Sequence, residues 1–213
     1  MKVPARLAAA LLLAVLVCSR ASAAFWPPET AGLVQSARHR LEISSARRPI
    51  GNFGEIEPGV FRGAQPSGAA AYLFLKEAGV SVVVDLRYLH KDDQTLCRRY
   101  GLSCARFPIM LFPGQDEFFN WTELKRAFFF VLAERRAGRV VFIHCRDGAD
   151  RTGVLAAALV IRASHLSPAE LWSHIWLTMR GYGFHDVYRS LKRRVQNWVF
   201  HPSRYPWICT GRP

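Results

Sequence analysis

Residues 139–153 have the sequence RVVFIHCRDGADRTG, which combines a short apolar run, a turn and the start of a helical pattern. The run from Val140 to Ile143 is β-branched and aromatic, and this predicts a buried strand. The run from Val154 to Ala163 is rich in Ala, Leu and Val and predicts a buried helix. A loop between two such elements places successive backbone N–H groups around a concavity at the positive end of the helix. The segment therefore predicts an anion-binding loop.

The side chains of this loop indicate phosphate chemistry. Cys145 follows the predicted strand, where the N–H donors of the loop favour a nucleophilic thiolate over a thiol. Arg151 offers a planar pair of N–H donors that can bind two phosphoryl oxygens. Thr152 can donate its hydroxyl to the sulfur. His144 is expected to orient the loop through a ring N–H, and the sequence leaves both a structural and a catalytic role open for it.

The loop interior is predicted to bind phosphate together with Arg151. It consists of Arg146, Asp147, Gly148, Ala149 and Asp150. At Gly148 we expect close backbone approach or an unusual φ, which a Cβ would obstruct. One basic and two acidic side chains give the interior a net charge of −1. It therefore differs from the Lys-rich loop expected of a lipid polyphosphate phosphatase.

The spacing of His144-Cys145, five residues and Arg151-Thr152-Gly153 resembles the signature of the Cys-dependent protein tyrosine phosphatases, especially the compact dual-specificity subgroup. Segments 52–54, 60–67 and 82–87 resemble the opening strands and helix of that subgroup and extend the likeness over roughly residues 50 to 200. The likeness is closest to small secreted or periplasmic bacterial members. A rhodanese-like loop also presents a cysteine in this way, but the Arg-Thr-Gly ending argues against it. A buried structural cysteine with an incidental arginine is the other alternative.

The resemblance implies a general acid on a separate mobile loop, about thirty residues before the cysteine. Asp116 lies 29 residues before Cys145 and follows Pro113 and Gly114, which could act as hinges. The alternative role for Asp116 is the N-cap of a helix that begins near Glu117. The other candidates for the acid are Glu117 and, more distantly, Asp92 or Asp93. Three further charged residues are expected to brace the phosphate loop: Arg62, Asp85 and Arg87.

The order of predicted elements indicates a single α/β domain with a central, mostly parallel sheet flanked by helices. Strands are expected around Val60 and at 80–86, 104–108 and 140–143, and helices at 69–78, 92–100, 117–137 and 154–163, with further helices towards the C-terminus. The predicted organisation is a signal peptide (1–23), an N-terminal arm (24–50), a tyrosine phosphatase-like catalytic domain (51–201) and a C-terminal tail (202–213).

The N-terminus has the pattern of a secretory signal. Lys2 and Arg6 precede eleven apolar residues, 7–17, and the small-residue site Ala21-Ser22-Ala23 follows. Eleven apolar residues are too few to span a bilayer as an anchor, which needs about twenty. We therefore expect cleavage after Ala23 and a periplasmic or secreted product of 190 residues.

The chain is strongly basic, with a net charge of +13, which falls to +10 without the signal peptide. Such a charge attracts anionic substrates and permits peripheral contact with an anionic envelope surface. The cluster of Arg189, Lys192, Arg193 and Arg194 is interpreted as the solvated face of a helix whose Leu191, Val195 and Trp198 point inward. No nucleic-acid partner is expected, and the oligomeric state is left open.

Four cysteines follow the predicted cleavage site: Cys97, Cys104, Cys145 and Cys209. A disulfide among Cys97, Cys104 and Cys209 is compatible with export, although the sequence gives no connectivity. Cys104 is also a candidate to protect or switch an oxidation-prone Cys145, with a buried packing role as the alternative.

The predicted function is an exported phosphatase that hydrolyses phosphotyrosine on proteins, with phosphoserine or phosphothreonine as further substrates, through a phosphocysteine intermediate. The catalytic residues would be Cys145, Arg151 and Asp116, supported by His144 and Thr152. The alternatives are an inositol phosphate or phosphoinositide phosphatase and a phospho-binding module that has lost catalysis. The histidines show no metal-ligand spacing, and neither a metal nor another cofactor is expected.

Overall fold

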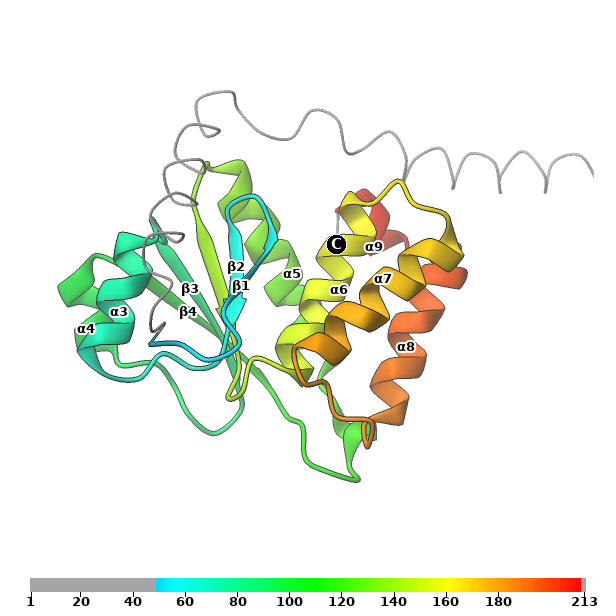
Figure 1. The fold of residues 1–213 in the computed structure, drawn as a ribbon, viewed down its shortest axis with the longest axis horizontal. Coiled ribbons are helices and arrows are strands. Elements are labelled where there is room, and N and C mark those ends of the chain that lie inside the picture. The colour runs from blue at the N-terminus through cyan, green and yellow to red at the C-terminus, as the bar shows by residue number, and fades with distance from the viewer. Residues whose placement is uncertain (1–48, 212–213) are drawn as a thin grey trace, which may run out of the picture.

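The computed structural model describes residues 49–211, which form one α/β domain around a five-stranded sheet (Figure 1). The strands are β1 (Gly54–Glu57), β2 (Val60–Gly63), β3 (Val82–Arg87), β4 (Ser103–Ile109) and β5 (Val141–His144), in the order β1-β2-β5-β3-β4. Strands β2, β5, β3 and β4 are parallel, and β1 pairs antiparallel with β2. The predicted mostly parallel sheet is confirmed.

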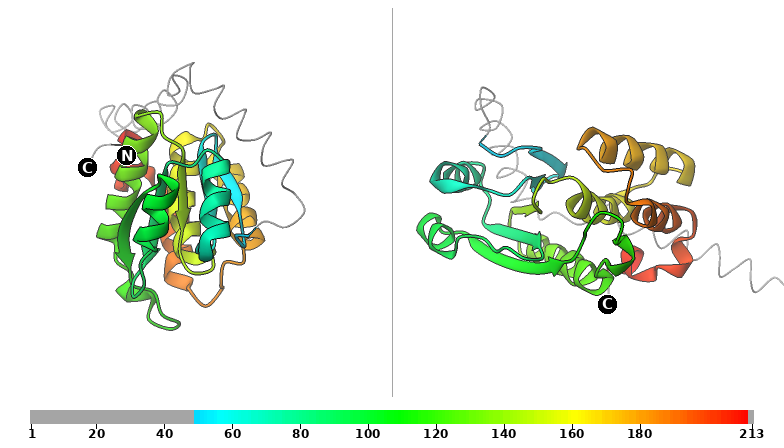
Figure 2. Two further views of the ribbon diagram at one scale, coloured as in Figure 1. Left: turned by 90° about the vertical axis from the view of Figure 1, so that its left-hand side faces the viewer. Right: turned by 90° about the horizontal axis from the view of Figure 1, so that it is seen from below.

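Helices cover both faces of the sheet, as the two turned views show (Figure 2). The helices are α3 (Gly68–Glu77), α4 (Gln94–Tyr100), α5 (Trp121–Arg136), α6 (Asp150–Ala163), α7 (Pro168–Gly181), α8 (Arg189–Phe200) and α9 (Pro206–Thr210), with the 3-10 turns η1 (Asp116–Phe118) and η2 (Pro202–Arg204). Helices α3 and α4 pack on one face. Helices α5 and α6 pack on the other, with α7, α8 and α9 against α6.

The sheet separates two hydrophobic cores because successive side chains of a strand point to opposite faces. In β5, Val141 and Ile143 join the larger core beneath α5 and α6, whereas Phe142 joins the smaller core beneath α3. All four residues of β5 are buried. The strand that leads to Cys145 is therefore held from both faces.

The structure differs from the sequence-based expectation at three places. Strand β1 was not expected as a separate element; it is short, and all four of its residues are only half-buried. Helix α5 begins at Trp121 and not near Glu117, because the Asn120 side chain accepts the N–H of Glu123 and caps the helix there. The expected tail from 202 contains η2 and α9, and α9 buries Ile208 against the larger core.

Cys97 and Cys104 form a disulfide between α4 and β4, with their Cα atoms 6.2 Å apart. The suggested role of Cys104 as a partner for Cys145 is therefore wrong, because its sulfur is already bonded. Cys145 is the free cysteine of the described residues.

The expected signal peptide and most of the expected arm lie in residues 1–48, outside the described residues. Within residues 49–211, none of the helices combines the length and the apolar character that crossing a bilayer requires.

Candidate active site

The loop after β5 lies at the carboxyl ends of the parallel strands, at the lower edge of the sheet in Figure 1. It leads directly into α6, which begins at Asp150, so the N-terminus of that helix faces the loop. The backbone N–H groups of residues 146–149 donate to no acceptor in the part of the chain that the structure describes. These groups are available to an anion.

Gly148 allows the loop to lie against the end of β2. Its φ is +72°, a conformation that L-residues rarely adopt. A Cβ at this position would lie 2.5 Å from the carbonyl oxygen of Gly63 and 2.7 Å from the nitrogen of Ala64. The close approach expected at this glycine is thus explained by the backbone of Gly63 and Ala64, which leaves no space for a side chain at Gly148.

Cys145 is buried at the start of the loop and is 3 % exposed. His144, which is fully buried, lies with Nδ1 3.0 Å from the carbonyl oxygen of Cys145 and Nε2 3.1 Å from Oδ2 of Asp92. Because a carbonyl oxygen only accepts, Nδ1 carries a proton and donates it to Cys145. The ring therefore orients the loop, and its other nitrogen contacts Asp92.

A buried ion-pair network of Arg87, Asp85 and Asp92 contacts His144 through Asp92. Arg87 bonds both oxygens of Asp85 at 2.9 Å, Oδ1 of Asp92 at 2.7 Å and Oε1 of Gln65 at 2.9 Å. The N–H of Gln65 donates to the carbonyl oxygen of Arg146 at 3.0 Å, which ties this network to the loop. The interpretation of Asp85 and Arg87 as bracing residues agrees with these contacts.

Arg62 braces the loop from the opposite side. Its Nη2 donates to the carbonyl oxygen of Gly148 at 2.5 Å, and its guanidinium lies 3.9 Å from the centre of the Tyr182 ring. Burial lowers the pKa of Arg62 to about 10, while the nearby Tyr182 and Cys145 act in the other direction. Asn52 adds a further tie by donating to the carbonyl oxygen of Asp147 at 2.8 Å.

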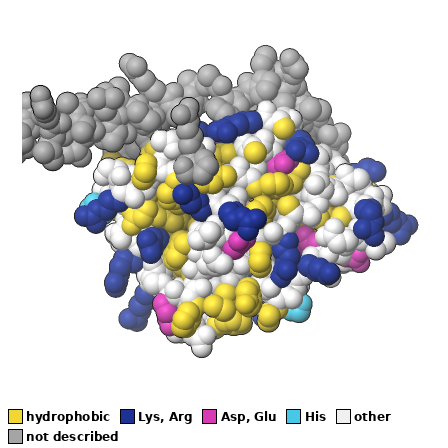
Figure 3. Space-filling model, turned by 180° about the vertical axis from the view of Figure 1, so that it is seen from behind, with side chains coloured by type: hydrophobic (Ala, Val, Ile, Leu, Met, Phe, Trp, Pro, Cys, Tyr) yellow, Lys and Arg dark blue, Asp and Glu magenta, His cyan; other side chains and the backbone are white. Residues whose placement is uncertain are grey.

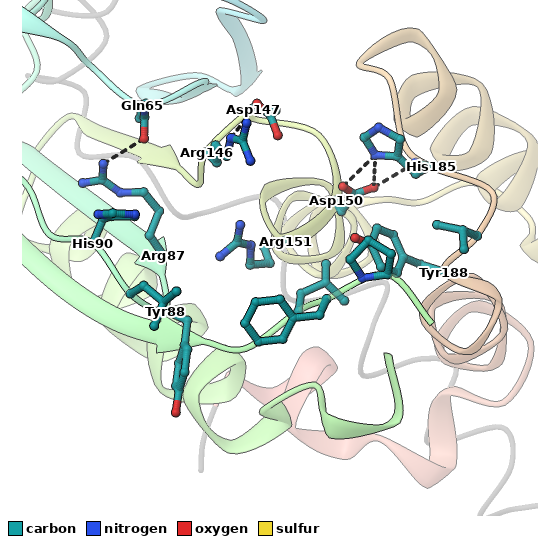
Figure 4. Close-up of a pocket in the computed structure, with 15 residues that line it drawn as sticks. Gln65, Arg87, Tyr88, His90, Arg146, Asp147, Asp150, Arg151, His185 and Tyr188 are labelled. Carbon is teal, nitrogen blue, oxygen red and sulfur yellow. Dashed lines mark hydrogen bonds and ion pairs between the residues drawn. The ribbon is translucent and has the colours of Figure 1, made fainter. Parts of the chain in front are cut away.

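The loop opens into a cavity of about 400 Å³ (Figure 4). Its floor includes Arg151, which points into the centre of the cavity in the close-up and also lies within 3.4 Å of the carbonyl oxygen of Ile109. Basic side chains and apolar side chains share the remaining walls: Arg87, His90, Arg146 and His185, and Tyr88, Leu89, Phe112, Val187 and Tyr188. The cavity can thus accept a phosphate on its floor and an apolar group at its mouth.

Asp150 and His185 form a pair at the wall of the cavity that the sequence did not reveal. Oδ1 of Asp150 accepts the backbone N–H of His185 at 2.8 Å, and Oδ2 lies 2.9 Å from its Nδ1. Figure 4 shows both residues beside Arg151. No local pattern pointed to His185, because it lies 35 residues after Asp150 in the turn between α7 and α8.

Asp116 lies outside the set of residues that line this cavity. Its Oδ2 accepts the backbone N–H of Ser190 at 2.8 Å and the Ser190 hydroxyl at 2.5 Å, at the start of α8. These hydrogen bonds, led by that of the hydroxyl, hold the pKa of Asp116 below its ordinary value. Asp116 thus stabilises the N-terminus of α8, not that of α5. Like Cys145, it is not among the residues that line the cavity with Arg151.

The remaining candidates for the acid are also located by the structure. Glu117 is exposed in η1, and Asp93 accepts the N–H groups of Thr95 and Leu96 as the N-cap of α4. Asp92 is buried in the network of His144 and Arg87. None of these three carboxylates lines the cavity.

Asp85, Asp92 and His144 bring three potential metal ligands within 4.8 Å of one another. The Arg87 guanidinium bonds both carboxylates, so it already supplies the positive charge that a cation would bring. The arrangement fits an ion-pair network better than a metal site.

Comparison with known families gave a match over residues 47–171 to the model described as the DSP-PTPase phosphatase fused to NAD+ kinase. Comparison with curated protein sequences gave no match. Solved structures with a similar fold include TpbA of P. aeruginosa, at 20% identity and a TM-score of 0.54, with 72% of this chain and 88% of that chain covered.

Two further solved structures have a similar fold. The catalytic domain of the PP-IP phosphatase SIW14 from S. cerevisiae is 15% identical, with a TM-score of 0.56 and coverage of 76% of this chain and 93% of that chain. PTPMT1 in complex with PI(5)P is 17% identical, with a TM-score of 0.53 and coverage of 71% and 98%. At such identities the similarity establishes the fold.

Proposed function

The chain belongs to the family of dual-specificity and tyrosine phosphatases whose model spans residues 47–171, and from this membership we propose that it is an exported phosphatase acting on phosphotyrosine in proteins through a phosphocysteine intermediate. The observation that carries the proposal is the loop of Cys145 and Arg151, whose N–H groups at residues 146–149 are free to bind phosphate oxygens. Phosphoserine and phosphothreonine are secondary substrates.

In the proposed reaction the Cys145 thiolate attacks phosphorus and the bond from phosphorus to the ester oxygen breaks. Arg151 and the loop N–H groups bind the three phosphoryl oxygens as negative charge spreads over them. Water then attacks phosphorus and gives a proton to the carboxylate that acted as the acid in the first step. The bond from phosphorus to sulfur breaks, and inorganic phosphate and the Cys145 thiolate are released. The hydroxyl of Thr152 is buried and has no hydrogen-bond partner in residues 49–211, so it is available to stabilise the departing thiolate.

The leaving oxygen must take up a proton, and we assign this proton to Asp116. The assignment requires segment 110–119 to move so that the carboxyl leaves Ser190 and reaches the cavity. Phe112 and Pro113 of that segment already line the cavity. Gly114 has a φ of +73°, and a Cβ at this position would have no atom of the described residues within 4 Å. The segment therefore has room to rearrange. Asp147 and Asp150 are the carboxylates that already line the cavity, and Asp150, which is the more buried of the two, is the candidate to compare with Asp116.

Export is supported by two observations. The first 23 residues have the pattern of a cleavable signal, and the Cys97–Cys104 disulfide is a feature that persists in oxidising compartments.

The basic side chains on the face seen in Figure 3 are scattered among neutral surface and are not gathered into one stripe. On α8, Leu191, Val195 and Trp198 are buried as predicted, so the basic residues of that helix form its solvated side. This distribution favours general attraction of anions over a nucleic-acid groove.

Phosphotyrosine is favoured over inositol phosphates by the apolar mouth of the cavity. Tyr88, Leu89 and Phe112 can contact an aromatic ring, whereas an inositol polyphosphate needs unpaired basic partners for several phosphates. Of the basic side chains on the walls, Arg87, Arg146 and His185 are already paired with Asp85, Asp147 and Asp150. The acidic side chains of Asp147 and Asp150 line the same cavity and would repel additional phosphates. A structure of the similar TpbA contains phosphotyrosine, which agrees with this preference.

The experiment compares phosphotyrosine peptides with inositol hexakisphosphate at matched ionic strength, using the exported protein. We expect kcat/KM on the peptides to exceed that on the inositol phosphate by at least about tenfold, or 1.4 kcal/mol. The reverse order would favour the inositol phosphatase. Hydrolysis of an aryl phosphate that Cys145→Ser abolishes would exclude a module that only binds phosphate, and activity retained by this variant would contradict the phosphocysteine intermediate.

A further inference from the structure

Exposed apolar side chains gather around the mouth of the active-site cavity. Among the large apolar residues that are exposed within residues 49–211, four line this one cavity: Tyr88, Leu89, Phe112 and Val187. Single apolar residues are normal on a protein surface, whereas a group of them around a cavity indicates a binding surface. We call these four residues the apolar rim.

The apolar rim lies on both sides of the phosphate-binding floor. Tyr88 and Leu89 follow β3, whereas Val187 lies in the turn between α7 and α8. Figure 4 shows Tyr88 on one side of Arg151 and Tyr188, from the same turn as Val187, on the other. A chain that brings its phosphate to Arg151 therefore passes between two apolar walls, and the group that occupies the rim is the part of the substrate next to the phosphorylated residue.

The backbone of both walls is held by side chains of other elements. On the β3 side, the guanidinium of Arg106 donates to the carbonyl oxygen of Tyr88. On the other side, Oδ1 of Asp150 accepts the backbone N–H of His185 at 2.8 Å. The walls are thus in place before a ligand arrives, which lowers the entropic cost of binding.

We propose that the apolar rim selects phosphotyrosines that have a bulky apolar residue two positions away on either side, an inference that rests on the proposed function. In an extended peptide successive side chains point to opposite faces, so the residues at −2 and +2 share the face of the phosphotyrosine and lie about 7 Å from it. With the phosphate on the floor, these two side chains meet the walls. Leu89 and Val187, the most exposed members of the rim, are the specificity-determining residues.

Acidic flanking residues gain less from the same surface. Arg146 and His185 line the cavity, but they are paired with Asp147 and Asp150. An acidic residue of the peptide would therefore meet a carboxylate beside each of these cations. Burial of apolar surface does not depend on these charges and is the stronger source of selectivity.

The test uses the exported protein and phosphotyrosine peptides that differ at positions −2 and +2, where three of them carry Leu, Ser or Glu. A fourth peptide carries Leu at −1 and +1 and Ser at −2 and +2. We expect kcat/KM on the first peptide to exceed that on each of the others by at least about tenfold at matched ionic strength. The gain should appear in KM, because these contacts are made equally in the ground state and the transition state.

Two leucines of equal exposure provide the matched variants. Leu89 and Leu177 are each 70 % exposed, but Leu177 lies on α7 and does not line the active-site cavity. In Leu89→Ser the preference for the Leu peptide over the Ser peptide should fall at least about threefold, whereas Leu177→Ser should keep the preference of the wild type. The ratio between two peptides cancels any effect of a variant on the phosphotyrosine itself.

The outcomes separate this inference from the proposed function. Equal kcat/KM on all four peptides, a preference for Glu, or a preference for Leu that Leu89→Ser leaves unchanged would overturn the inference alone. Hydrolysis of none of the peptides would overturn both. Binding to vesicles of anionic phospholipid that Leu89→Ser abolishes, together with no preference among the peptides, would assign the apolar rim to a lipid surface instead.

Discussion

The phosphate loop and segment 110–119 face the same cavity but are held in opposite ways. The phosphate loop is tied by Arg62 and Asn52 on one side and by the Gln65 and His144 contacts on the other, and much of this network is buried. Segment 110–119 is mostly exposed, and its Asp116 bonds one residue of α8. If the loop binds phosphate and Asp116 donates the proton, as proposed, the binding groups are already in place, whereas the acid must first move.

Two glycines with nearly the same φ offer the strongest test of this contrast. A Cβ at Gly148 (φ +72°) would lie within 2.5 Å of backbone, whereas a Cβ at Gly114 (φ +73°) would have no atom of residues 49–211 within 4 Å. Gly148→Ala should lower the free energy of unfolding by about 3 kcal/mol or more and abolish phosphate binding, since backbone must shift. Gly114→Ala should cost only about 1 kcal/mol for the unfavourable φ. Chemical denaturation and phosphate titration measure both, and equal effects would contradict the contrast.

The next largest effect concerns the general acid. Asp116→Ala should lower kcat on an aryl phosphate ester with a poor leaving group by about a hundredfold and flatten the basic limb of its pH profile. Glu117→Ala is the matched control, because Glu117 is the exposed neighbour in η1, and it should behave as wild type. If the basic limb persists in Asp116→Ala but disappears in Asp150→Asn, the proton comes from the cavity wall.

The buried network should show a smaller, graded effect. Asp92→Asn removes the negative charge that contacts His144 and Arg87 but keeps the shape of the side chain. We expect kcat/KM to fall roughly tenfold, or about 1.4 kcal/mol, because His144 loses the charge that orients it. Asp93→Asn is the control, since Asp93 only caps α4. An effect of Asp92→Asn confined to stability would show that the network has no part in the reaction.

The smallest effect is expected at Ser190, the residue that holds Asp116. Ser190→Ala removes the hydroxyl bond and should raise the pKa of Asp116 towards its ordinary value, which NMR titration measures. Because the pKa of Asp116 is lowered in the folded state, this bond stabilises the protein above the unfolded pKa and its contribution disappears as the pH falls through the folded pKa. The stability of variant and wild type should therefore converge in acid.

The kinetic result of Ser190→Ala distinguishes a movable acid from a fixed cap. If Asp116 must leave Ser190 to act, the loss of about 1 kcal/mol of hydrogen bonding should raise kcat by up to about fivefold. A fall in kcat would mean instead that Asp116 works where it lies.

The sequence predicted those parts of the protein that depend on local pattern. The apolar run before Cys145 predicted the strand, and the small residues that follow predicted the loop and α6. These predictions succeed because hydrophobic periodicity and turn residues can be recognised within a short segment. The bracing roles of Asp85 and Arg87 followed from the family resemblance. Strand β1 was missed because four half-buried residues carry little signal.

The parts that escaped prediction depend on contacts between distant residues. The hydrogen bond of Asp116 to Ser190 joins residues 74 positions apart, and that of His185 to Asp150 spans 35. The pairing of Cys97 with Cys104 could not be chosen from the cysteine positions alone, because several connectivities were open. A short motif predicts the loop that holds Cys145, whereas the positions of Asp116 and His185 are decided by how α7 and α8 pack.

The disulfide has a consequence for how the protein tolerates oxidants. With Cys97 and Cys104 bonded to each other, neither can condense with a sulfenic acid formed on Cys145. Peroxide would then carry Cys145 onward to the irreversible sulfinic state unless a thiol from the surroundings intervened. Recovery after oxidative stress would depend on small-molecule thiols around the protein or on new synthesis of the protein.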